Sequence, residues 1–182
     1  MRYKDSNERT QDYLANFEEN AVLKKLVGKT APVVVDVGAN AGQTAEKIKN
    51  IWPNSKLHCI EPLEEPYSKL ERKTRHYADV RTYNHALGTH NGPKEFYVNN
   101  HQPMLSGFFE LNPDSQDSIA LNSPEPAHEN FLDGYKTIVE CKTLDTWAEQ
   151  NNITHMDLLK MDAQGAEPDI LRCGRNILNN TN

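Results

Sequence analysis

The stretch PVVVDVGANAGQT, residues 32–44, limits the fold of this chain more than any other part of it. Its first half is a β-branched run in which apolar and polar residues do not alternate, which is typical of a strand covered on both faces. Two glycines then break the run. Gly38 permits a tight turn, and Gly42 lets the next helix pack close to the strand or lets a ligand approach the backbone. The free N–H groups at the start of that helix favour an anionic group.

Buried strands and helices continue to alternate along the chain. The segments KLHCIEP (56–62) and VRTYNHAL (80–87) predict a second and a third strand, with helices between the strands. This order predicts an α/β fold with a doubly wound, mainly parallel sheet and right-handed crossovers. KEFYVN (94–99) and KTIVECKTL (136–144) predict an inserted antiparallel pair. MDLLKMD (156–162) predicts a further buried strand, and a helix follows over 167–178.

The chain divides into an N-terminal helical segment (1–30) and one larger domain (31–182). Apolar residues recur at helical spacing over 8–27, and an apolar content of 37% in 182 residues is enough for a single globular core. Residues 99–134 lose all periodicity, and such long connections are either functional or mobile. We interpret this connection as a surface loop or as a substrate lid with Phe108 and Phe109 as its apolar contacts.

Composition excludes several kinds of protein. A net charge of −6 disfavours binding to nucleic acid and to an anionic membrane surface. The three cysteines are widely spaced and form neither a disulfide framework nor a metal pair, so we expect a reducing, cytoplasmic location. No segment reads as a signal peptide or a membrane span. The histidines form no ligand cluster, so we predict no metal.

An acid follows the second strand, close to the expected position of the glycine turn. Glu61, at the tip of that strand, is placed to accept hydrogen bonds from both ribose hydroxyls of an adenosine ligand. The alternative is an ordinary solvated turn residue. The spacing Gly38-Ala39-Asn40-Ala41-Gly42 does not supply the dinucleotide fingerprint, and no phosphate-binding GK[ST] loop is present.

The motifs VVVDVGANAGQT, CIEP, NHALG, KTLDTW and MDLLKMDAQGAEPDIL together resemble the FkbM-type S-adenosylmethionine-dependent methyltransferases, over about residues 33–178. The resemblance implies a class I methyltransferase with a Rossmann-like fold that binds S-adenosylmethionine and methylates a hydroxyl of a small molecule or sugar. It also implies a role for each group of matching residues. Around the methionine moiety would lie Asp36, Gly38, Asn40 and Gly42, and the ribose would be held by Glu61, with Pro62 shaping the turn. Near the adenine would lie Asn84, Ala86 and Leu87, and Asp162 would face the methyl donor.

Three residues are candidates for the base that takes the acceptor's proton. Asp162 is the first, although a carboxylate at a strand tip can instead contact the cofactor or cap the next helix. Glu167 is the second, although an acid in the first turn of a helix is favourable anyway. His85 is the third. The family has an acid where this chain has Gln164, so we expect no base there.

Three readings of the function remain, together with an expectation about the end of the sheet. The chain can be a methyltransferase, or a non-catalytic module that binds S-adenosylmethionine without turnover. A different adenosine-ligand enzyme with the same kind of sheet is a third, weaker reading. Because the sequence ends soon after the helix at 167–178, we expect the C-terminal part of the sheet to be missing. The apolar edge left open would then pair with a second copy as a homodimer.

Overall fold

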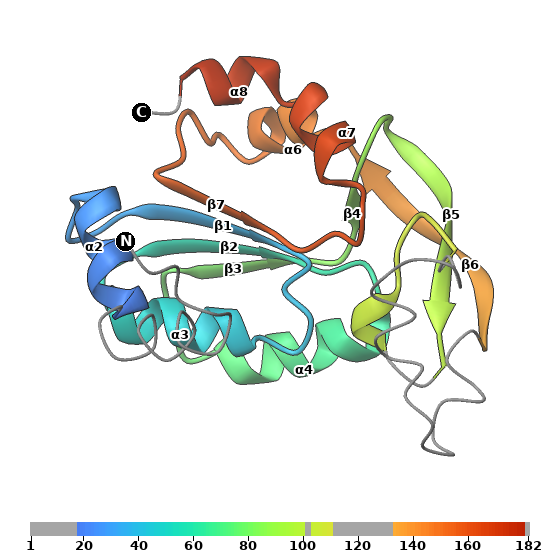
Figure 1. The fold of residues 1–182 in the computed structure, drawn as a ribbon, viewed down its shortest axis with the longest axis horizontal. Helices are drawn as coiled ribbons and strands as arrows, with labels where there is room; N and C mark the ends of the chain where they lie inside the picture. Colours follow the sequence, from blue (N-terminus) through green and yellow to red (C-terminus); the bar gives the residue numbers. More distant parts are fainter. Residues whose placement is uncertain (1–17, 101–102, 111–132, 181–182) are drawn as a thin grey trace, which may run out of the picture.

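The computed structural model describes residues 18–100, 103–110 and 133–180. Its centre is a four-stranded parallel sheet in the order β3-β2-β1-β7 (Figure 1). Because β1 lies between β2 and β7, the winding of the chain reverses there, and ligands of such sheets bind beyond the carboxyl ends of the strands at this point. The four strands are β1 (Val33–Val37), β2 (Lys56–Ile60), β3 (Val80–Tyr83) and β7 (Leu158–Met161).

Helices cover both faces of this sheet, which confirms the doubly wound α/β fold (Figure 1). Successive residues of β1 face opposite sides, so Val34 packs in the core under α3 and α4 while Val35 packs in the core under α6 and α8. The unbroken apolar run of β1 follows from this double coverage. On one face lie α2 (Glu19–Val27), α3 (Gln43–Ile51) and α4 (Glu64–Thr74); on the other lie α6 (Leu144–Gln150), α7 (Glu167–Arg172) and α8 (Arg175–Asn179).

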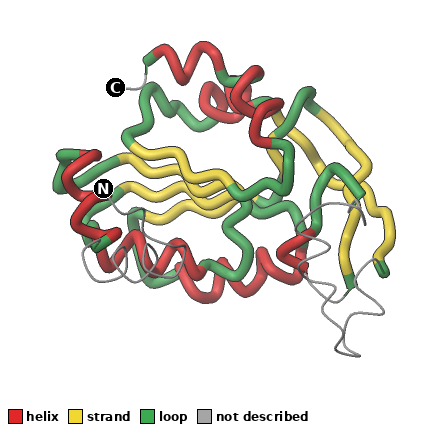
Figure 2. The backbone as a smooth tube through the Cα atoms, in the orientation of Figure 1, coloured by secondary structure: helices red, strands yellow, loops and turns green. Residues whose placement is uncertain are grey.

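A second, three-stranded sheet stands beside the carboxyl ends of the main strands (Figures 1 and 2). It has the order β4-β6-β5 and consists of β4 (Ala86–Leu87), β5 (Gly92–Asn99) and β6 (Gly134–Lys142). β5 and β6 are antiparallel, as predicted for the inserted pair, and β4 runs parallel to β6. After β5 the short 3₁₀ helix η1 (Pro103–Leu105) leads to Gly107, which bridges back to Tyr97.

The predicted third strand, 80–87, is wrong as a single element. The chain leaves the main sheet after Tyr83 and joins the second sheet as β4. The side chain of Asn84 stabilises this exit, because its amide donates to the carbonyls of Glu61 and Pro62, both at 3.1 Å. Two short apolar strands in succession look the same in the sequence as one longer strand.

The predicted helices differ at their ends. α2 accounts for the second half of the helix expected over 8–27, and it ends at Gly28 with a left-handed φ of 64°. Residues 8–17 of that helix, and all of 1–17, lie outside the described residues. The helix expected over 167–178 is two helices, α7 and α8. Gly174 lies at the break, where a Cβ atom would come 2.4 Å from Cδ2 of Leu144.

Candidate functional site

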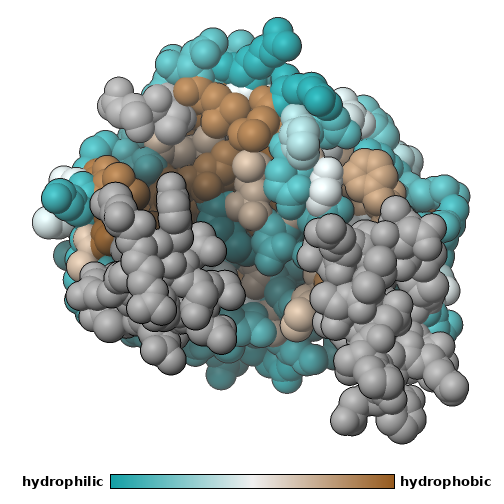
Figure 3. Space-filling model, in the orientation of Figure 1, coloured by the Kyte–Doolittle hydropathy of each residue, from teal (hydrophilic) through white to brown (hydrophobic). Residues whose placement is uncertain are grey.

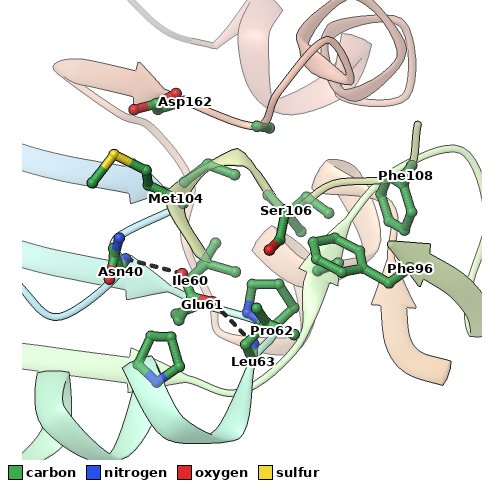
Figure 4. A pocket seen from close by; sticks show the side chains of 16 residues that line it. Asn40, Ile60, Glu61, Pro62, Leu63, Phe96, Met104, Ser106, Phe108 and Asp162 are labelled. Atoms are coloured by element: carbon green, nitrogen blue, oxygen red, sulfur yellow. Dashed lines mark hydrogen bonds between the residues drawn. The ribbon is translucent and has the colours of Figure 1, made fainter. Parts of the chain in front are cut away.

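A pocket opens where the carboxyl ends of β1, β2 and β7 meet the second sheet (Figure 4). The empty space within it is about 650 Å³ when the open solvent at its mouth is included. Seven of the predicted site residues line it: Gly38, Asn40, Glu61, Pro62, Ala86, Leu87 and Asp162. The other lining residues are Val37, Ile60, Leu63, Pro66, Phe96, Met104, Ser106, Phe108 and Ala163.

Gly38 is the closest contact between the glycine turn and β7. Its φ is 74°, and a Cβ atom there would lie 2.1 Å from the carbonyl oxygen of Asp162. The N–H groups of Gly38 and Ala39 both donate to the carbonyl of Ile60 at 3.0 Å. The turn is therefore held between the two neighbouring strands, and only glycine fits at its first position.

Gly42 has a different role from Gly38. Its φ is 82°, and a Cβ atom there would lie 3.0 Å from Cδ1 of Leu70 and 3.2 Å from Cδ of Lys73, both on α4. Gly42 does not line the pocket. Gly42 therefore allows close packing against α4, which differs from the packing of helix on strand that the sequence suggested.

Glu61 connects the turns that follow β1 and β2. Its Oε2 accepts the N–H of Asn40 at 2.9 Å and its Oε1 accepts the N–H of Leu63 at 3.0 Å (Figure 4). Burial raises the pKa of this carboxyl, and the two backbone hydrogen bonds oppose that rise. The side chain is only 6% exposed, so Glu61 is not a solvated turn residue. Each carboxylate oxygen keeps further acceptor capacity for a ligand in the pocket.

Asp36 lies beneath the turn and not on the pocket wall. It is completely buried, with its Oδ1 3.0 Å from Nζ of Lys160, the residue beside it on β7. Neither oxygen accepts a well-directed hydrogen bond from the described residues, so we treat this contact as an ion pair. Burial raises the pKa of Asp36, and Lys160 opposes the rise. The same ammonium donates to the carbonyl of Gly38 at 3.3 Å, which links Asp36 to the turn.

The three candidate bases lie in different surroundings. Asp162 is exposed and lines the pocket, and its Oδ1 accepts a hydrogen bond from Nε2 of Gln164 at 2.9 Å. Glu167 does not line the pocket. Its two oxygens accept the N–H groups of Ala163 and Gly165, at 2.6 and 2.9 Å.

His85 also lies outside the pocket lining. It is buried, its Nδ1 lies 3.1 Å from the carbonyl of Ala86, and burial lowers its pKa. Its Nε2 has no partner among the described residues. Asn84 also lies outside the pocket lining. Its side-chain amide hydrogen-bonds the turn after β2 and so fixes the chain where it leaves β3.

The wall formed by the second sheet was missed by the sequence reasoning. Phe96, Met104 and Ser106 were not among the expected site residues, although the apolar alternation of KEFYVN was a signal for Phe96. Phe108, expected as a lid contact, lines the pocket, whereas Phe109 is largely exposed and does not. Residues 101–102 and 111–132 of the expected lid lie outside the described residues.

No group of three or more His, Cys, Asp or Glu side chains within the described residues could hold a metal ion. None of the helices in that part of the chain is long and apolar enough to span a membrane.

A glycine turn follows the first strand and a buried acid lies at the tip of the second, both at the switch point of a doubly wound sheet, which is an arrangement typical of nucleotide-binding sheets. The sequence matches the family described as the methyltransferase FkbM domain over residues 36–181. The chain belongs to this family.

Two relatives with sequence similarity to this chain are named as methyltransferases. The chain is 26% identical to the 2-O-methyltransferase NoeI of Sinorhizobium fredii, over 87% of this chain and 64% of the relative. It is 26% identical to the methyltransferase sdnD of Sordaria araneosa, over 78% of this chain and 60% of the relative. The chain thus spans less than two thirds of the length of these relatives. Among solved structures, a SAM dependent methyltransferase from Aquifex aeolicus is 21% identical, with 46% of this chain and 47% of that one covered and a TM-score of 0.31.

Proposed function

We propose that this chain binds S-adenosylmethionine and takes part in methyl transfer to a hydroxyl of a small molecule or sugar. The observation that carries the proposal is the buried Glu61 carboxylate, which is fixed by two backbone N–H groups and lines the pocket at the switch point of the sheet. Membership of the FkbM family and the similarity to a 2-O-methyltransferase support the same activity. They also argue against an unrelated adenosine-ligand enzyme.

The pocket residues fit this cofactor in chemistry and in order. The left-handed turn with Gly38 and Asn40 offers backbone to the methionine moiety, and Glu61 offers a carboxylate to the ribose hydroxyls. Ala86 and Leu87 give an apolar wall for the adenine. We propose that Asp36, which lies outside the lining, acts indirectly, by holding Lys160 against the turn.

S-adenosylmethionine, when bound, supplies an electrophilic methyl group on a sulfonium sulfur. The protein's main task is then to align the acceptor hydroxyl and to exclude competing water. We propose Asp162 as the group that accepts the hydroxyl proton. Gln164 orients this carboxylate through Oδ1 and leaves Oδ2 without a partner among the described residues.

One observation favours the non-catalytic alternative. Gln164 occupies the position where the family pattern has an acid, so Asp162 has an amide beside it in place of a second carboxylate. Binding of the cofactor without turnover, measured with a panel of sugar and small-molecule hydroxyls, would support this alternative over the enzyme.

The first test is calorimetric titration with S-adenosylhomocysteine. We expect micromolar binding by the wild type and a loss of about tenfold or more in Glu61→Gln, because hydrogen bonds to a charged group contribute about 1.5–3 kcal/mol. Glu149→Gln, a change at an exposed residue of α6, is the matched control and should bind like the wild type. A wild type that does not bind, or a Glu61→Gln variant that binds equally well, contradicts the proposed site.

We also propose a cytoplasmic location and a homodimer for this protein. The free state of all three cysteines supports a reducing, cytoplasmic location. The homodimer stays a prediction. In its support, β7 pairs only with β1 within the described part of the chain, and Figure 3 shows apolar surface between β7 and α8.

A further inference from the structure

One end of the pocket is apolar and comes largely from the second sheet. Ala86 on β4 and Phe96 on β5 form a hydrophobic cluster against which Leu63 and Phe108 pack. Figure 4 shows Phe96 and Phe108 on the side of Glu61 away from Asn40. A ligand whose ribose is held by Glu61 and whose charged end lies at the glycine turn would therefore place its remaining group in this apolar end.

The wall at this end is held in place by specific contacts. The rings of Phe96 and Phe108 meet edge to face, with centroids 5.3 Å apart and an interplanar angle of 80°. Nζ of Lys94 lies 3.8 Å from the centroid of the Phe108 ring. Gly107 and Tyr97 exchange two backbone hydrogen bonds, at 2.8 and 3.0 Å. Ser106, which lies between these contacts in the sequence, is thus fixed on the wall.

Ser106 presents the one polar side chain that the wall adds to this end. It is 9% exposed, lines the pocket, and its Oγ accepts the backbone N–H of Asn99 at 3.0 Å. A serine hydroxyl has a single proton to donate, and no acceptor for it lies among the described residues. A buried donor needs a partner. The pocket therefore presents one O–H donor beside an apolar wall.

We propose that Ser106 recognises the purine base of the ligand by donating a hydrogen bond to one of its ring nitrogens, and that Phe96 and Phe108 form the apolar wall against which the base packs. A purine is flat and apolar on its faces and carries acceptor nitrogens at its edge, which is the shape and polarity that this end of the pocket offers. The inserted sheet is then a specificity element and not only a cover. This inference rests on the proposed function, because it assumes an adenosine ligand in the pocket.

The test is titration of wild type and Ser106→Ala with S-adenosylhomocysteine and with its 1-deaza, 3-deaza and 7-deaza analogues. We expect Ser106→Ala to lower the affinity for S-adenosylhomocysteine about tenfold. In the wild type, one of the three analogues should lose affinity to a similar extent. That same analogue should bind equally well to wild type and Ser106→Ala, because the interaction is already absent.

Ser68→Ala, a change on α4 outside the pocket, is the matched control and should bind all four ligands like the wild type. If the wild type binds all three analogues as well as S-adenosylhomocysteine, the inference is overturned without any variant having to fold. If Ser106→Ala weakens every ligand equally, Ser106 is merely structural and the inference is again overturned. If the wild type fails to bind S-adenosylhomocysteine, the proposed function falls together with the inference.

Discussion

Glu61 shows how a single side chain can both build a site and serve in it. Its two oxygens hold the backbone of Asn40 and Leu63, so the turns after β1 and β2 keep a fixed separation. The carboxylate is also the acceptor that we propose for a ribose. A change at Glu61 therefore acts on the shape of the pocket as well as on the ligand, which is why the amide variant Glu61→Gln is preferred to alanine in the binding test.

Replacing Gly38 by alanine should strongly lower the free energy of unfolding, although the change adds only one methyl group. In Gly38→Ala the new methyl group would meet the carbonyl oxygen of Asp162 and the residue would hold a positive φ. We expect this variant to lose at least about 3 kcal/mol of unfolding free energy, measured by urea titration, since strand β7 must move away. Gly28→Ala, at φ 64° with nothing within 4 Å, isolates the backbone contribution and should lose only about 1 kcal/mol. Equal losses in the two variants would contradict the close contact between the turn and β7.

The connection from β7 to α7 holds two carboxylates, Asp162 and Glu167, which are five residues apart and lie in different surroundings. The oxygens of Glu167 are occupied by two backbone N–H groups, whereas Asp162 faces the pocket. We expect Glu167→Gln to lower the free energy of unfolding by about 1–2 kcal/mol, with little change in the pH profile of turnover. Asp162→Asn should keep its affinity for S-adenosylhomocysteine and lose turnover.

Both variants are compared with wild type by urea titration, calorimetry and a methyl-transfer assay. A Glu167→Gln variant that folds as stably as the wild type and loses turnover would reverse the two assignments. An Asp162→Asn variant that loses binding and keeps activity per bound cofactor would show that Asp162 holds the cofactor instead.

Elements with a strong local pattern could be predicted from the sequence, and elements defined by their partners could not. The run PVVVDV and the glycine turn identify β1 and its turn because a tight left-handed turn favours glycine whatever the rest of the fold. The division of 80–87 into β3 and β4 depends on which sheet each half joins, and Asn84 decides this through contacts with the β2 turn. Such contacts between distant residues leave no periodic signal in the sequence.

The same reasoning applies to the pocket. Gly38 and Glu61 could be predicted because strand tips of a parallel sheet meet at one edge. Phe96 and Ser106 could not, because their position depends on how the second sheet stands against the first. Glu167 looked like a candidate base because an acid near a strand tip is compatible with either role, and the backbone hydrogen bonds that it accepts are visible only in three dimensions.

At the scale of the whole molecule, His58 should contribute a loss of stability in mild acid. This histidine lies on β2, is nearly buried, and has its Nδ1 2.9 Å from the hydroxyl of Tyr83. Burial, with smaller contributions from the nearby Arg81 and Lys56, lowers its pKa to about 4. Below pH 6.5, the ordinary pKa of histidine, His58 binds a proton in the unfolded chain but stays neutral in the folded chain. This group therefore lowers the stability as the pH drops from 6.5 towards 4.

We expect His58→Gln to remove about 2–3 kcal/mol of the stability change between about pH 7 and pH 4.5, measured by urea titration at each pH. Glutamine can still hydrogen-bond to Tyr83 but does not titrate. The raised pKa values of Asp36 and Glu61 act in the opposite direction, so only the difference between variant and wild type is diagnostic. His90→Gln, at an exposed histidine, is the control. An unchanged pH dependence in His58→Gln would show that His58 is protonated in the folded protein.

The parallel pairing of β7 with β1 also has a consequence for folding during synthesis. A chain emerging from the ribosome carries the glycine turn and Glu61 long before it carries Lys160 and Asp162. Until β7 arrives, the carboxylate of Asp36 lacks its ion-pair partner and one wall of the pocket is absent. Because a ligand stabilises only the form that binds it, the cofactor that we propose would stabilise the chain most once β7 has completed the pocket. Its stabilising effect would follow the synthesis of β7, the last strand of this sheet in sequence order.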